Sequence, residues 1–251
     1  MPYAKRQKFQ TYTAKRFGGF KKVVQFSDED IKKDKAFYKK NLKILSVEKG
    51  NGFYLWKPYI ILKTIESLKE DDVLMYCDVD TIFLDDFKPV ISTMLKNRLD
   101  IMVFDLPNKE YQYSKYNLCE ALGLTSQDIL TSNQRCASYH LWRKTEFSLN
   151  FLNEWLDLCS QYDLICDDVT SYHPDYGDQF IFNLQDQSIF SLLSKKHAIT
   201  SFRDPSNWGN TMKNEYTNSP YPQLLYNAVS DSRKLWLLTY LLGKNYLAKL
   251  K

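Results

Sequence analysis

Short apolar segments that could form buried strands alternate along this chain with longer segments of helical periodicity. The predicted strands are residues 22–26, 72–76, 101–104 and 137–142. The predicted helices are residues 3–17, 27–45, 55–68, 87–97, 146–161 and 178–194. Such alternation is typical of an α/β fold in which helices flank a mainly parallel sheet. Because no repeat and no linker-like segment interrupts the pattern, we expect a single domain over residues 1–230.

The composition is that of a globular protein and narrows the possible functions only a little. Of 251 residues, 44% are apolar and 25% are charged, which excludes a disordered chain, a collagen-like repeat and a coiled coil. The net charge of +4 is too small to indicate a nucleic-acid binder. The 5 cysteines are odd in number and lack Cys-x-x-Cys spacing, so we expect reduced thiols in a cytoplasmic protein. Neither a signal peptide nor a membrane-spanning segment is predicted.

The most informative motif is a pair of aspartates at the end of an apolar strand. The strand predicted at residues 72–76 leads directly into Cys77 and then into Asp78 and Asp80. In open α/β sheets, ligands bind beyond the carboxyl ends of the strands. Two acids there would repel each other unless a cation bridges them, and Mn²⁺ or Mg²⁺ with open positions for phosphate fits. We therefore predict that Asp78 and Asp80 hold a metal that binds a substrate phosphate. The alternative is a solvated turn, where aspartate is common.

Two enzyme classes place Asp-x-Asp after a buried strand. In metal-dependent glycosyltransferases the motif holds a nucleotide diphosphate through the metal. In haloacid-dehalogenase-like phosphatases the first aspartate, here Asp78, would be a nucleophile. The phosphatase motif continues as Asp-x-Asp-x-Thr, whereas Ile82 stands at that position and Thr81 lies one place early. The pattern therefore favours a glycosyltransferase.

An aromatic and basic block precedes the aspartates. The segment Gly-Asn-Gly-Phe-Tyr-Leu-Trp-Lys-Pro-Tyr-Ile-Ile-Leu at residues 50–62 resembles Gly-x-Gly-Tyr-Trp-x-Trp-Lys-Pro-Tyr-Ile-Ile of a family of bacterial glycosyltransferases with a GT-A-like fold. The resemblance continues at residues 141–147, in the Asp-Gln-Ser block of residues 186–193 and at residues 202–206, and so covers roughly residues 5–210. It implies an enzyme that moves a sugar from a nucleotide-diphosphate sugar, by analogy a UDP-sugar, to a hydroxyl of a capsule, lipopolysaccharide or related surface glycan.

The aromatic and basic block supplies candidate donor-binding residues. The flat faces of Tyr54 and Trp56 could stack on a base or a sugar. Lys57 is a cation at a predicted helix start, where a diphosphate would also meet free backbone N–H groups. The alternative is that Trp56 belongs to the core and that Lys57 is merely solvated.

Three later residues complete the candidate site. Asp186 and Gln187 lie in the otherwise apolar segment 180–193, where a carboxylate is costly unless it is paired or used. Asp186 is the candidate base or acceptor-orienting residue, with Gln187 beside it, although Asp186 could also be a helix cap. Arg203 could bind the diphosphate or pair with Asp204.

The chain also departs from the family pattern. Family members usually begin with a buried strand ahead of the helix predicted here at residues 3–17. Nothing apolar precedes that helix, so we expect either that the first strand is missing or that the chain starts late. This departure motivates a third alternative, a non-catalytic nucleotide- or glycan-binding relative. A third metal ligand is not obvious, because His173 and His197 lack a partner at ligand spacing.

The last segment, residues 231–251, is basic and amphipathic. Such a composition is typical of an interfacial membrane helix, although a terminal helix packed on the domain would look similar. The first alternative would place a cytoplasmic enzyme at the inner face of the cell membrane, beside a lipid-linked glycan acceptor.

Overall fold

The computed structural model describes residues 2–227, which fall into two compact units built from separate stretches of the chain. The small unit comprises the described parts of Met1–Gln25, Cys77–Arg98 and Phe202–Lys251, and the large unit comprises Phe26–Tyr76 and Leu99–Ser201. The tail predicted at residues 231–251 lies outside the described residues. No helix within residues 2–227 is long and apolar enough to cross a membrane.

The large unit is organised around a sheet with the strand order β1-β5-β3-β4. These strands are β1 Val73–Cys77, β5 Tyr139–Arg143, β3 Ile101–Lys109 and β4 Asn133–Arg135. Strand β3 runs antiparallel to β5, with Ile101 opposite Trp142, and antiparallel to β4, with Asp105 opposite Arg135. The prediction of a mainly parallel sheet is wrong for these pairings. The helical excursion over residues 110–132 turns the chain back beside β3 in the opposite direction, which residue periodicity alone does not reveal.

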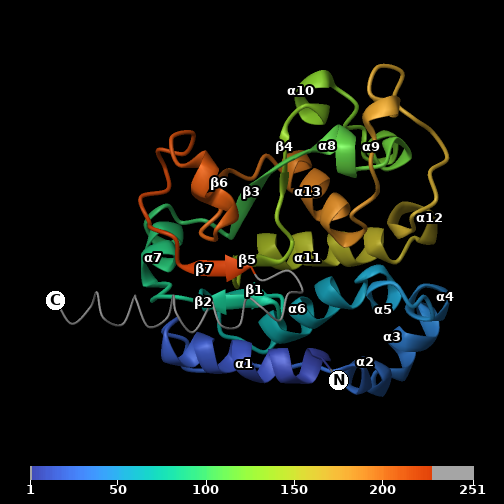
Figure 1. Ribbon diagram of the computed structural model, residues 1–251. Helices are drawn as coiled ribbons and strands as arrows, with labels where there is room; N and C mark the ends of the chain where they lie inside the picture. The colour runs from blue at the N-terminus through green and yellow to red at the C-terminus, as the bar shows by residue number, and fades with distance from the viewer. Residues whose placement is uncertain (1, 228–251) are drawn as a thin grey trace. The chain divides into compact units, whose positions relative to one another are not determined.

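Helices cover this sheet, so the α/β prediction is confirmed. The helices of the large unit are α2 Asp28–Lys33, α3 Lys35–Lys40, α4 Leu42–Leu45, α5 Gly50–Phe53, α6 Trp56–Glu66, α8 Glu110–Tyr113, α9 Tyr116–Leu122, α10 Gln127–Leu130, α11 Glu146–Cys159, α12 Tyr162–Ile165 and α13 Asp186–Lys196, with the 3-10 turn η1 Gly177–Gln179. Helix α11 packs against both α6 and α13 (Figure 1). The core between these elements includes the fully buried side chains of Ile65, Trp142, Trp155 and Phe190.

Three predicted elements of the large and small units differ from the structure. Residues 22–26 form no strand, and residues 27–45 form three short helices rather than one. The helix restarts at Asp34, whose carboxylate caps α3 by accepting a hydrogen bond from the Phe37 backbone N–H at 3.0 Å. The helix predicted from residue 178 begins only at Asp186, because Gln185 has a φ of 46°, outside the helical region.

The small unit packs one long helix beside a two-stranded sheet (Figure 1). Its elements are α1 Pro2–Arg16, β2 Thr81–Phe83, α7 Lys88–Lys96, η2 Trp208–Met212 and β7 Leu225–Asn227, while β6 Ser201–Arg203 spans the division between the units. Strands β2 and β7 are antiparallel, with Ile82 opposite Tyr226. The rings of Phe20, Phe83 and Phe87 contact one another and form the aromatic part of this unit's core.

Candidate active site

The two aspartates of the Asp-x-Asp motif lie in the short turn that joins β1 to β2. The turn is closed by a hydrogen bond from the Thr81 backbone N–H to the Asp78 carbonyl oxygen at 3.1 Å. Helix α1 also holds it, because the buried amide of Gln10 donates to the carbonyl oxygens of Cys77 and Asp78 at 3.0 and 2.9 Å. The backbone of the motif is therefore fixed by a neighbouring helix, while the side chains of Asp78 and Asp80 are each partly accessible.

The carboxylates of this turn create a local negative field. Burial is the main cause that raises the pKa of the Cys77 thiol, and the charges of Asp78 and Asp80 raise it further. Within residues 2–227, no group of three or more histidine, cysteine, aspartate or glutamate side chains is arranged to hold a metal ion. Two carboxylates nevertheless suit a hard divalent cation whose remaining positions are taken by water and substrate phosphate, as is usual for Mg²⁺. The donor set of the turn fits such a metal.

The Trp-Lys-Pro and Asp-Gln-Ser blocks meet in the large unit through a buried ion pair. The Lys57 ammonium lies 2.8 Å from the Asp186 carboxylate, and each side chain is only 4% exposed. Asp186 is the first residue of α13, where a negative charge is favoured by the helix dipole. The interpretation of Asp186 as the helix cap is wrong, since Gln185 occupies the cap position. The interpretation of Lys57 as a solvated cation is wrong as well.

Both blocks also form hydrogen bonds to the same loop. Lys57 donates to the Ala137 carbonyl oxygen at 3.2 Å, and the Gln187 side-chain oxygen accepts from the Ala137 backbone N–H at 3.2 Å. Ala137 lies in the loop between β4 and β5, so its peptide groups are held from both sides. Lys57 therefore forms one hydrogen-bonded cluster with Asp186 and Gln187, although it lies far from both in the sequence. We call these three residues the Lys57 cluster.

Tyr54 and Trp56 are both partly exposed but contact different parts of the large unit. The indole N–H of Trp56 donates to the Gly50 carbonyl oxygen at 2.9 Å, and the half-buried ring packs against the main core. Tyr54 is also partly exposed, with a left-handed φ of 65°, and its ring lies 5.4 Å from the Lys57 ammonium. Tyr54 thus belongs beside the Lys57 cluster, whereas the indole N–H of Trp56 holds the 50–53 turn.

A histidine that the sequence did not single out lies close to the same cluster. His140 on β5 is fully buried, stacks on Tyr76 at 5.2 Å between ring centroids, and accepts a hydrogen bond from Trp142 Nε1 through Nδ1 at 2.6 Å. Burial, and then the charge of Lys57, lower the pKa of His140 well below its ordinary value. The imidazole is therefore neutral in the folded protein.

Because His140 folds as a neutral group, acid is expected to destabilise the large unit. The unfolded chain takes up a proton on this residue below its ordinary pKa of 6.5, so stability is complete above that pH and falls below it. Between pH 6 and 5, the free energy of unfolding of the unaltered chain should fall more steeply than that of His140→Gln. The difference between the two slopes should be about 1 kcal/mol per pH unit. Urea denaturation of both proteins at a series of pH values checks this. Equal slopes would show that His140 is not buried neutral.

The remaining candidates have structural partners. Arg203 in the small unit is 3% exposed; its guanidinium donates to the Tyr221 carbonyl oxygen and, at 3.4 Å, to that of Asp204. His173 accepts from the Asp175 backbone N–H at 3.0 Å. His197 lies 2.6 Å from a carboxylate oxygen of Glu154. Each of these side chains is thus tied to its local fold, and Asp78, Asp80 and Arg203 belong to the small unit while the Lys57 cluster belongs to the large one.

Comparisons with known proteins complete the description of the site. No family model matches the chain, and no curated protein matches its sequence. Among solved structures, the chain is similar to the galactosyltransferase LgtC in complex with donor and acceptor sugar analogues, with a TM-score of 0.49 and 12% identity over 97% of this chain and 92% of that chain. Mouse xyloside xylosyltransferase 1 in its apo form gives a TM-score of 0.44 and 10% identity over 91% of this chain and 92% of that chain. An active-site variant of LgtC gives a TM-score of 0.46 and 14% identity over 97% of this chain and 92% of that chain. At these identities and TM-scores the likeness assigns neither a family nor an activity to this chain.

Proposed function

We propose that the chain is a metal-dependent glycosyltransferase that moves a sugar from a nucleotide-diphosphate sugar, in our view a UDP-sugar, to a hydroxyl of a surface glycan. The observation that carries the proposal is the Asp78–Asp80 turn, which presents two carboxylates directly after a strand of the sheet on a backbone held by Gln10. The resemblance of the Trp-Lys-Pro and Asp-Gln-Ser blocks to bacterial capsule and lipopolysaccharide glycosyltransferases supports it further.

In this proposal the small unit supplies the residues that hold the diphosphate. Asp78 and Asp80 would bind Mn²⁺ or Mg²⁺, which when bound stabilises the negative charge that develops on the leaving diphosphate. Arg203 is positioned by Tyr221 and would add positive charge.

The Lys57 cluster would handle the sugar hydroxyls. Its ion pair holds the Asp186 carboxylate in one orientation, as an acceptor for a hydroxyl hydrogen bond or proton. Gln187 adds an amide that can donate and accept. If the displacement is direct, Asp186 would act as the base for the acceptor hydroxyl.

The function is tested by following nucleoside diphosphate release from a panel of UDP-sugars with and without Mn²⁺. We expect slow release that requires the metal and quickens when a suitable glycan acceptor is added. Hydrolysis of phosphate esters with a phosphate trapped covalently on Asp78 would instead identify a phosphatase. Binding of UDP without turnover of any donor would identify a non-catalytic relative.

Asp186→Asn is expected to lower transfer about 100-fold, because an amide cannot accept the hydroxyl proton and a positioned base contributes at least that factor. Binding of UDP should be unchanged, since we assign the diphosphate to other residues. Transfer kinetics and calorimetric UDP binding, measured on the same sample, check the expected loss of transfer and the unchanged UDP affinity. Asn keeps the side-chain shape but removes the anion that pairs with the buried Lys57, so a loss of stability is expected as well. A thermal melt of the sample shows whether it is folded at the assay temperature. Full transfer activity in this variant would remove Asp186 from the mechanism.

A further inference from the structure

A polar cavity of about 320 Å³ opens in the large unit, away from the first residue of α13. Its polar lining consists of Asp105, Ser132, Asn133, Arg135, Lys195 and Ser201, with Ile129 as an apolar wall. Helix α13 packs on β4 beside it (Figure 1). The volume is in the range of small-ligand sites, which begins at about 300 Å³. Nine residues of α13 separate Lys195 from Asp186, a rise of about 13 Å, so the cavity is distinct from the Lys57 cluster.

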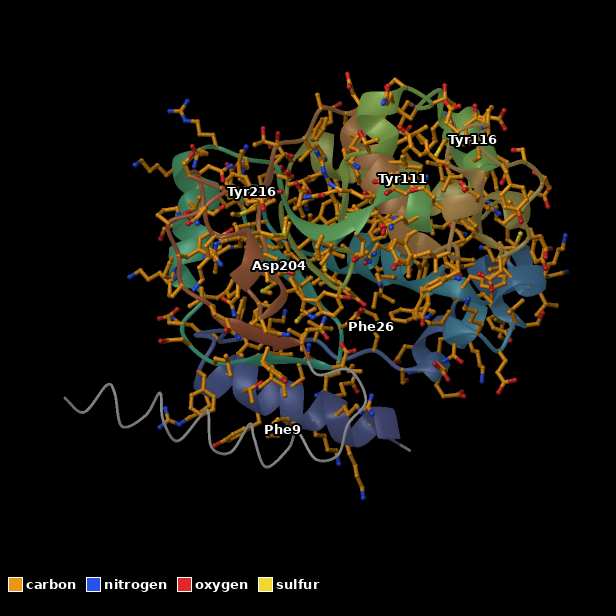
Figure 2. All side chains as sticks on the ribbon, turned by 45° about the horizontal axis from the view of Figure 1, so that its top comes forward. Phe9, Phe26, Tyr111, Tyr116, Asp204 and Tyr216 are labelled. Carbon is orange, nitrogen blue, oxygen red and sulfur yellow. The ribbon has the colours of Figure 1, made fainter. Side chains whose placement is uncertain are left out.

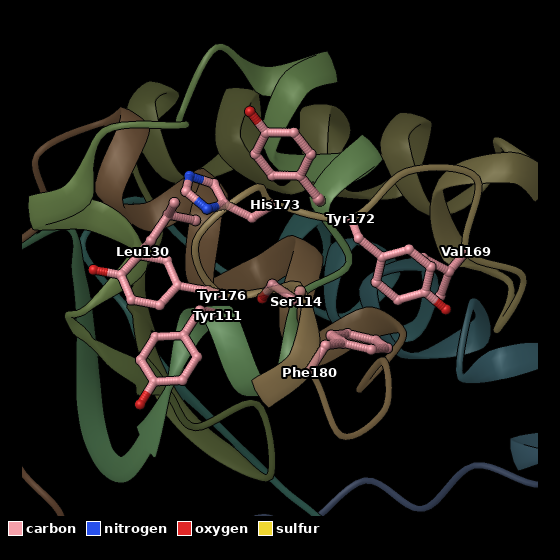
Figure 3. Close-up of a pocket in the computed structure, with 10 residues that line it drawn as sticks. Tyr111, Ser114, Leu130, Val169, Tyr172, His173, Tyr176 and Phe180 are labelled. Atoms are coloured by element: carbon pink, nitrogen blue, oxygen red, sulfur yellow. The ribbon is translucent and has the colours of Figure 1, made fainter.

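A second pocket of the large unit is far smaller and serves as a contrast. Aromatic rings of α8, α9 and the 172–180 segment surround it (Figure 3), and Tyr111 and Tyr116, marked in Figure 2, are among them. Tyr111 stacks on Tyr176 with 4.9 Å between ring centroids. The free volume is only about 10 Å³, room for about one water molecule. This aromatic cluster is therefore packed against itself, whereas the polar cavity is open.

The floor of the polar cavity is a buried, fully bonded lysine. Lys195 Nζ donates to Glu110 at 2.5 Å, to the Ser132 hydroxyl at 2.7 Å and to the Asn133 carbonyl oxygen at 2.8 Å. Glu110 is 0% exposed and also accepts from the hydroxyls of Ser191 and Ser114. Because every one of these groups has a fixed neighbour, the polar atoms facing the cavity are held in place before any ligand arrives.

The wall of the cavity is formed by the neighbouring antiparallel strands β3 and β4. Asp105 on β3 lies 3.7 Å from Arg135 on β4, and the Ser201 hydroxyl donates to the Asp105 carboxylate at 2.7 Å. The side chains of Asp105 and Arg135 are 12% and 10% exposed, so only a small part of each faces the cavity. A carboxylate and a guanidinium side by side offer acceptors and donors to a pair of neighbouring hydroxyls.

The lining alone carries one net positive charge, and the buried Glu110 that pairs with Lys195 behind it cancels this charge. Arg135 and Lys195 carry two positive charges, and Asp105 and Glu110 carry two negative ones. A phosphate or carboxylate ligand would meet the Asp105 carboxylate and would gain no net attraction. A neutral ligand rich in hydroxyl groups meets no such opposition and can use both donors and acceptors.

From this charge balance, volume and preorganised donor set, we propose that the cavity is a binding site for one neutral sugar unit of a glycan. The site is separate from the transfer centre proposed above and needs neither metal nor nucleotide. Its polar network continues to the Lys57 cluster, because Gln134 donates to Glu110 at 3.3 Å and accepts from Gln187 at 3.1 Å. Occupation of the cavity is thus connected by hydrogen bonds to the residue beside Asp186.

The test is ligand-observed NMR of the full chain with methyl β-D-galactoside, methyl α-D-glucoside and N-acetylglucosamine as neutral probes and inorganic phosphate as the anionic probe. We expect saturation transfer to at least one sugar. Phosphate carries no non-exchangeable proton, so it is followed by its ³¹P line width, which should not broaden when the protein is added. Ser201→Phe, which fills the cavity, should abolish the sugar signal, while Ser126→Phe at an exposed position without a side-chain cap bond should keep it.

Asp105→Asn gives a second measurement that does not depend on bulk. It keeps the shape of the side chain and leaves the four charged groups, with Glu110 counted, at one net positive charge. Sugar affinity should therefore fall roughly tenfold and phosphate binding should appear. Phosphate binding to the unaltered protein, no sugar binding at all, or a sugar signal that survives both Ser201→Phe and Asp105→Asn would each overturn the proposal. UDP binding measured on the same samples tests the transfer centre independently, so failure of one proposal is distinguishable from failure of the other.

Discussion

Replacing Lys57 with methionine is expected to lower the free energy of unfolding by about 3–5 kcal/mol, because it leaves the Asp186 carboxylate buried without its cation. The 2.8 Å contact and the 4% exposure of both side chains leave too little water beside the carboxylate to replace the ammonium. Methionine has a similar length, so the loss reports on the charge more than on a cavity. Urea denaturation of the variant and the unaltered chain measures the difference.

Two further variants make that measurement specific to the buried pair. Lys63→Met lies on the same helix, α6, where Lys63 is half exposed and 3.9 Å from Glu66, and it should change stability by at most about 1 kcal/mol. The double variant Lys57→Met with Asp186→Leu should regain most of the lost stability, since it removes both buried charges. If Lys57→Met behaves like Lys63→Met, the two blocks do not form a buried ion pair.

The Lys57 cluster illustrates what the sequence can and cannot predict. The Trp-Lys-Pro and Asp-Gln-Ser blocks stand out because charged residues in apolar surroundings need partners. Their direct contact could not be predicted, because 129 residues separate Lys57 from Asp186 and no local period connects them. His140 was missed for a related reason, since a histidine within an apolar strand gives no signal until its aromatic neighbours are known.

In the fold as well, elements that depend on neighbouring residues could be predicted, whereas pairings between distant residues could not. The strand β1, which ends at Cys77, was predicted well, because an uninterrupted apolar segment bounded by polar residues has few alternatives. The antiparallel pairing of β3 with β4 depends on how residues 110–132 fold between them, and the restart of the helix at Asp34 depends on one cap. The Glu110–Lys195 pair joins α8 to α13 across 85 positions of the chain, so no local pattern predicts it.

Asp80→Ala is expected to remove metal-dependent nucleotide binding while the chain remains folded. The turn that carries Asp80 is held through backbone groups by Gln10 and Thr81, so loss of the carboxylate should leave its shape intact. Removing one of two carboxylate ligands should weaken metal binding about 100-fold or more, because two protein ligands are few to begin with. Asp86→Asn, an exposed aspartate of the same unit, serves as the matched control.

The most direct measurement of the central claim is calorimetric titration of UDP into the full chain, into Asp80→Ala and into Asp86→Asn, each with Mn²⁺ and then with EDTA. A nucleotide site built on the Asp78–Asp80 turn predicts binding with Mn²⁺ to the unaltered chain and to Asp86→Asn. It predicts no measurable binding to Asp80→Ala or to any of the three in EDTA. Equal UDP affinity in Asp80→Ala and the unaltered chain, or affinity that is indifferent to EDTA, would contradict the assignment of this turn as the metal and diphosphate site.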